Sequence, residues 1–168
     1  MAYTTPPTVS TGQTWTAANQ NQYIRDNFID LVAYKGTKVI RTSNQAITGA
    51  LAYVSFDTED HDTDAFHAGG DPTKITIPAG FGGYYYINAH VLWAGGAGDN
   101  EMKIIKNAAT VLHLTSCGSE AAGTSSWLAF SVLLAATDYL RVGCVTAINK
   151  NIEHDNNSLF FGAYLLRS

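Results

Sequence analysis

The densest group of side chains that could do chemistry lies between residues 57 and 67. Hard cations such as Ca²⁺ bind several carboxylate oxygens on a flexible loop. The segment lacks the glycine placement and the terminal glutamate of an EF-hand loop. Two interpretations stay open, a solvated acidic loop and a Ca²⁺ site, and no other cofactor is expected. The segment holds five carboxylates in eight residues and a nearby histidine: Asp57, Glu59, Asp60, Asp62, Asp64 and His67.

A second candidate is His90, which lies in a strongly β-prone segment beside Tyr86 and Asn88. If that side of the strand lined a three-fold axis, three imidazoles would meet there. Such a group can bind a metal or titrate together. The alternative is a histidine that is only hydrogen-bonded.

Motifs for catalysis are missing from the sequence. It contains neither a Gly-x-Ser-x-Gly elbow nor a His-Glu-x-x-His pair. The glycine-rich segment 95–98 lacks the lysine and the hydroxyl residue of a phosphate-binding loop. We therefore expect a protein that is not an enzyme.

Charge and composition narrow the partners. The 168 residues include 14 acidic and 10 basic side chains, with only 14% charged residues. Because no Lys/Arg cluster exists, we expect no binding to nucleic acid or to anionic membranes. No apolar run is long enough for a bilayer span, and the N-terminus lacks a signal-peptide pattern. A surface with so few charges is easily desolvated, which favours permanent assembly.

The two cysteines, Cys117 and Cys144, lie far apart in apolar, strand-like segments. Two cysteines do not make a disulfide framework. We expect buried free thiols, with a single disulfide as the alternative.

Residues 1–36 are predicted to form an extended arm and one short α-helix. The first 13 residues are rich in Thr, Pro and Gly, and Pro6-Pro7 favours a polyproline conformation. Between residues 14 and 35 a helical stripe appears, with Thr14 and Thr16 as candidate N-caps. The helix either packs on its own domain or self-associates around a symmetry axis. The stripe consists of Ile24, Phe28 and Leu31.

From about residue 38 the hydrophobic pattern has period two, which is typical of strands. Turn signals separate many short runs, so the sequence predicts an all-β sandwich or barrel. The predicted strands are 39–47, 51–56, 74–78, 84–93, 101–105, 110–115, 126–134, 139–146 and 159–166.

Two of these strands lack a polar face. In 84–93 the odd positions form an apolar core face, but the even positions begin with Tyr84 and Tyr86. In 159–166 both faces are apolar. An isolated antiparallel sandwich normally carries polar residues outside, so exposed patches of this kind favour association. The alternative is that the N-terminal helix covers this sheet.

Three stretches resemble the C1q/tumour-necrosis-factor superfamily. They are Ala50–Asp57, then Lys74–Pro78 followed by Gly83–Ile87, and the terminal Ser158–Leu165. The resemblance implies a ten-strand antiparallel jelly-roll sandwich over residues 37–168 and a tight homotrimer with aromatics on its axis. The expected trimer interface consists of Tyr84, Tyr86, His90, Phe161 and Ala163. If the pleat is reversed, their neighbours of opposite parity form the interface instead.

The segment from Gly12 to Asn27 resembles a short leader common in bacteriophage virion proteins. That resemblance implies a trimer at the virion surface, assembled in the host cytoplasm. It would decorate or cement the capsid, binding other virion proteins through residues 1–36 with the jelly roll projecting. The alternative is a tail-fibre adhesin whose loops recognise a cell-surface glycan or protein receptor.

Overall fold

The protein is described by a computed structural model that covers residues 11, 12, 14, 16–25, 28, 33–67, 70–118, 123–155 and 159–167. The chain divides into two compact units, Met1–Tyr34 and Lys35–Ser168.

In the first unit, helix α1 spans Ala17–Gln20 and continues into a π-helical turn at Asn21–Arg25. Thr16 is the N-cap: its backbone is extended and its hydroxyl accepts a hydrogen bond from the Asn19 N–H at 3.2 Å. This confirms one of the two predicted caps. Within the described residues, no helix is long and apolar enough to cross a bilayer.

The predicted helical stripe is only partly described. Ile24 and Phe28 are 60% and 63% exposed. Leu31 lies outside the described residues, and so does most of the predicted arm at 1–13. Packing of this stripe therefore stays a prediction.

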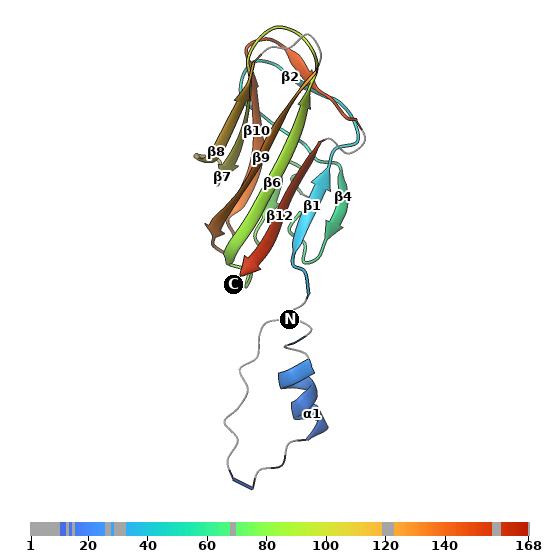
Figure 1. Cartoon of the computed structure of the whole chain (residues 1–168), viewed down its shortest axis with the longest axis vertical. Helices are drawn as coiled ribbons and strands as arrows, with labels where there is room; N and C mark the ends of the chain where they lie inside the picture. The colour runs from blue at the N-terminus through green and yellow to red at the C-terminus, as the bar shows by residue number, and fades with distance from the viewer. Residues whose placement is uncertain are drawn as a thin grey trace. The chain divides into compact units, whose positions relative to one another are not determined.

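The second unit is a sandwich of two antiparallel sheets, and the predicted all-β jelly roll is confirmed (Figure 1). Sheet A has the order β2 (Gln45–Ile47), β11 (Lys150–Ile152), β6 (Gly83–Trp93), β12 (Phe160–Arg167), β1 (Gly36–Ile40) and β4 (Thr58–Asp62), with β9 (Thr124–Leu134) pairing with β6. Sheet B has the order β3 (Ala52–Tyr53), β10 (Tyr139–Thr146), β7 (Asn100–Lys106) and β8 (Thr110–Cys117), with β5 (Lys74–Thr76) pairing with β10.

The core fills the space between the sheets, and strand β6 shows how the sequence determines its inner face. Its odd residues are buried and its even residues are partly exposed, as the period-two pattern predicts. Trp93 is fully buried, and its indole N–H donates to the Ser126 hydroxyl at 2.9 Å. Sheet B contributes Met102, Ile104 and Val142 to the same core.

The described residues form twelve strands rather than ten, and the strands that the sequence did not predict separately are β2, β4 and β11. The single strand predicted at 39–47 is two strands, β1 and β2, which lie far apart in sheet A. The chain turns between them, where Arg41 donates to the Ser55 carbonyl at 2.6 Å and Asp57 accepts from the Thr42 N–H at 2.9 Å. The acidic segment predicted as a loop is strand β4, paired with β1.

Candidate interaction surface

The outer face of sheet A carries an unusual set of aromatic side chains. Residues directly opposite each other on paired strands point to the same face. On β6, His90 is opposite both Trp127 of β9 and Phe160 of β12. We use the name aromatic face for the outward side chains of Tyr84, Tyr86, His90, Trp127, Phe160 and Tyr164.

One cluster on this face surrounds His90. The imidazole centroid lies 5.4 Å from that of Trp127 and 5.8 Å from that of Phe160. The Lys38 ammonium lies 5.5 Å from the Phe160 centroid on the other side. Trp127 is 57% exposed, so an aromatic projection stands out from the sheet.

A second cluster lies nearer the start of β6. The ring of Tyr164 stacks on Tyr86 at 6.4 Å and on His61 at 5.8 Å between centroids. Burial, helped by the nearby Asp60 carboxylate, raises the pKa of the Tyr164 phenol above its usual value. The phenol therefore keeps its proton, and this part of the face carries no tyrosinate charge. The Arg167 guanidinium lies 5.5 Å from the Tyr84 centroid.

Between the clusters, Gly162 leaves room for two polar groups. A Cβ on Gly162 would collide with the Asn88 amide oxygen and would lie 2.7 Å from the Tyr164 hydroxyl. A side chain at this position would require Asn88 and Tyr164 to move. The centre of the aromatic face is thus polar, while both ends are aromatic.

The register corrects part of the predicted interface. Tyr84, Tyr86 and His90 do lie on the outer face, but Phe161 and Ala163 are fully buried in the core. Phe161 is opposite Ala89 and Ala163 is opposite Ile87, which are core residues of β6. Their opposite-parity neighbours Phe160 and Tyr164 face outward instead.

Trp127 and Leu133 were not predicted, although they are 57% and 59% exposed on the outer side of β9. The outward positions of β9 are every second residue from 125 to 133. Hydrophobic alternation is weak there because the two large residues share this face with three small ones, Ser125, Ala129 and Ser131.

The Ca²⁺ site that was one of two interpretations of residues 57–64 is not assembled among the described residues. Alternation along β4 separates its carboxylates, and each of the five has another partner. Within the described part of the chain, no group of three or more His, Cys, Asp or Glu side chains is close enough to hold a metal ion. The partners are Thr42 for Asp57, His67 for Glu59, Lys38 for Asp60, the Phe66 and His67 backbone for Asp62, and Lys35 for Asp64.

The cysteines are both free thiols, and only one is in the core. Cys144 is fully buried, and burial raises the pKa of its thiol well above the usual value. Cys117 is half-buried, 3.4 Å from the Thr124 hydroxyl and 3.5 Å from that of Ser126, which corrects the expectation that both are buried.

Compared by sequence, the chain matches no protein-family model and no curated protein. Compared by structure, it is similar to murine APRIL at pH 5.0, with a TM-score of 0.65, 11% identity and coverage of 80% of this chain and 100% of that one. It is also similar to Eiger TNF from S. frugiperda (TM-score 0.60, 12% identity, 80% and 94% coverage). A third is the globular domain of zebrafish complement 1qA (TM-score 0.60, 13% identity, 79% and 98% coverage). These similarities establish a C1q/TNF-like jelly-roll fold.

Proposed function

We propose that this chain is a non-enzymatic structural module that assembles into a homotrimer through the aromatic face. The observation that carries the proposal is the exposure of large apolar side chains on that one face. Tyr84, Tyr86 and Trp127 are 45%, 37% and 57% exposed there, and Leu133, opposite Tyr84 on β9, is 59% exposed beside the aromatic face. Contiguous patches of this kind mark interaction sites in soluble proteins.

The composition of the aromatic face suits a protein partner. Tyr and Trp are enriched in the centres of protein interfaces, where charged residues are depleted. The charged groups Lys38 and Arg167 contact aromatic rings of this face. Fully burying each large side chain contributes roughly 1.5–3 kcal/mol, so covering several on each protomer favours association.

A second and a third copy of the chain are the proposed occupants. The resemblance of the strands to the C1q/TNF superfamily, together with the shared fold, supports three-fold rather than two-fold assembly. In this arrangement His90 and Asn88 of each protomer lie close to their symmetry copies. The polar centre of the face then fixes the register of the subunits, as single polar residues do in other apolar interfaces.

The proposed location is the surface of a bacteriophage virion, where the trimer decorates or cements the capsid. The leader-like segment from Gly12 to Asn27 supports this location. Residues 1–36 would bind other virion proteins and the jelly roll would project. Exposed Ile24 and Phe28 are available for such contacts.

Sedimentation velocity on substituted full-length chains tests the assembly surface. Trp127→Asp and Tyr86→Asp should each give folded monomers. Leu114→Asp is the matched control, because Leu114 is 43% exposed on sheet B. It should leave the oligomer intact. Oligomers that survive both substitutions on the aromatic face would refute this surface.

Immunogold labelling of virions of the encoding phage tests the location. Label over the head is the expected result. Label confined to the tail tip would support the tail-fibre adhesin instead, and unlabelled virions would exclude both. The adhesin is kept as the second function because a pocket lies beside β2, at the end of the sandwich opposite the start of β1 (Figure 1).

A further inference from the structure

A pocket of about 320 Å³ opens beside β2. Figure 1 shows β2 at the end of the jelly roll opposite the start of β1, and we call this the distal end. Its base is continuous backbone from three neighbouring strands of sheet A. In β11, Asn151 is paired with Ala46 of β2, and its carbonyl accepts from the Ala94 N–H at 2.9 Å just after β6. Strand β6 has eleven residues, so at about 3.3 Å per residue the pocket lies about 35 Å from the other end.

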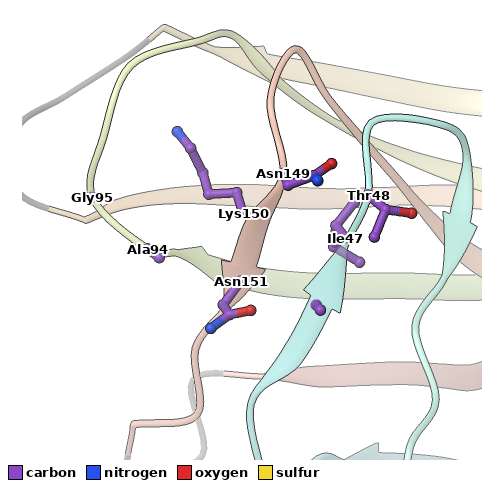
Figure 2. A pocket seen from close by; sticks show the side chains of 8 residues that line it. Ile47, Thr48, Ala94, Gly95, Asn149, Lys150 and Asn151 are labelled. Carbon is purple, nitrogen blue, oxygen red and sulfur yellow. The ribbon is translucent and has the colours of Figure 1, made fainter.

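One wall of the pocket is held in place by Lys150. Its side chain is only 8% exposed and extends toward the loop after β6 (Figure 2). The ammonium donates to the carbonyls of Gly96 at 2.9 Å and Gly98 at 3.4 Å. Both glycines have positive φ, 129° and 98°, a conformation that residues with a Cβ rarely adopt. A buried cation thus fixes the loop, and the pocket is preformed.

The remaining lining is neutral, with three polar side chains and a base of small residues. Thr48, Asn149 and Asn151 are exposed, and they can donate to and accept from a ligand. Figure 2 shows that Asn149, just before β11, and Thr48, just after β2, lie near each other at the upper ends of these strands. Ala46, Ala94 and Gly95 provide a shallow base between them. Among the described lining residues there is no carboxylate.

These features select a class of ligand. Amide side chains suit pairs of neighbouring hydroxyl groups because each has two donors and an acceptor. The small apolar base suits the C–H face of a ring. The pocket volume is at the lower limit for small-molecule sites, which suits one ring. The only charged lining group, Lys150, is already bonded to two carbonyls, so an anionic ligand gains little from it.

We propose that this pocket binds one residue of a neutral glycan, with Asn149, Asn151 and Thr48 holding its hydroxyl groups. This proposal names a ligand class for the tail-fibre adhesin alternative. The biological role of the pocket rests on that alternative, whereas sugar binding by the pocket does not. A single shallow pocket binds weakly, in the millimolar range. Three pockets at the same end of a trimer would raise the avidity for a surface that displays many copies of the sugar.

The test is saturation-transfer NMR on the full-length protein with separate monosaccharides. The neutral probes are glucose, galactose, mannose, N-acetylglucosamine and N-acetylgalactosamine, and the acidic probes are N-acetylneuraminic acid and glucuronic acid. We expect transfer to at least one neutral sugar. The double substitution Asn149→Ala/Asn151→Ala should weaken that binding about tenfold or more, because two amide hydrogen-bonding groups are lost.

Two further variants keep this test decisive. Thr48→Ala, just after β2, should also weaken binding. Thr110→Ala should leave it unchanged, because Thr110 is exposed at the start of β8 and is not part of the pocket. No transfer to any neutral sugar, transfer only to acidic sugars, or binding unaffected by the pocket substitutions would each overturn the proposal. Sedimentation of the same samples separates this failure from a failure of trimer assembly.

Discussion

The indole of Trp127 contacts the ring of Phe160 edge-on, with centroids 5.5 Å apart and ring planes inclined by 80°. The two residues belong to β9 and β12, which lie on opposite sides of β6. Both rings converge over His90, so side chains from three strands form one aromatic projection. An exposed cluster of this kind is typical of an interface hot spot.

The pleat of β12 makes neighbouring phenylalanines respond differently to substitution. Phe161→Ala removes a fully buried ring and should destabilise folding by about 3–5 kcal/mol. Phe160→Ala should cost far less folding stability, since Phe160 is partly exposed on the aromatic face, and should weaken association instead. Urea unfolding in a Trp127→Asp background would measure folding without the oligomer. Equal unfolding costs for the two substitutions would contradict the assigned pleat.

A side chain at Gly162 is predicted to displace the side chains of Asn88 and Tyr164. Gly162→Ala should destabilise the domain by about 1–3 kcal/mol, because the new Cβ forces Asn88 and Tyr164 to move. Gly118→Ala is the matched control, because nothing lies within 4 Å of a Cβ there. Thermal denaturation compares the two. The double variant Gly162→Ala/Asn88→Ala should recover part of the loss, and strict additivity would show that Asn88 is not the obstacle.

Asp71 should make the protein sensitive to acid. Hydrogen bonds from Thr73, then a 2.6 Å ion pair with Arg141, hold the pKa of its carboxyl well below the usual value. A carboxyl with a lowered pKa stabilises the fold above its unfolded pKa, and this stability is lost as the pH falls toward the folded pKa. Asp71→Asn should therefore cost about 1–2 kcal/mol at pH 7 and progressively less between about pH 5 and pH 2.

Melting temperatures across that pH range measure this effect. The control is Asp99→Asn, which removes an exposed carboxylate outside the Asp71–Arg141 pair and should leave the melting temperature at pH 7 close to that of the unsubstituted protein. An Asp71→Asn deficit that is as large at low pH as at pH 7 would assign the effect to packing rather than to ionisation.

The two thiols should differ in reactivity. The Cys144 thiol is fully buried with a raised pKa, so neither access nor ionisation favours its reaction. Cys117 is half-buried at the end of an edge strand and should react first. Labelling with a maleimide at neutral pH, read by mass spectrometry, should add one label to the folded protein and two after unfolding. Two labels on the folded chain, or labelling of Cys144 alone, would contradict the described burial.

The sequence predicted the fold class and the inner face of β6, because strict period-two alternation there reports directly on burial. It did not predict which face Phe161 occupies. In a strand with apolar residues on both sides, the inner face is decided by register against β6, and pattern alone contains no such information. A bulge between Leu165 and Arg167 shifts that register further.

Strand β4 was missed for a different reason. Its residues are almost all charged or polar, so no hydrophobic alternation marks it as a strand. It lies at the edge of sheet A beside β1, where charged side chains protect an unpaired edge from other strands. The acidic segment contributes to the sheet through pairs such as Lys38 with Asp60.

The mass of the unsubstituted full-length protein in solution, measured by sedimentation equilibrium, tests the central claim most directly. A chain of 18.1 kDa that associates through the aromatic face should sediment as one species with three times that mass. A monomer at all concentrations would contradict self-association on this face, and a stable dimer would contradict its three-fold symmetry.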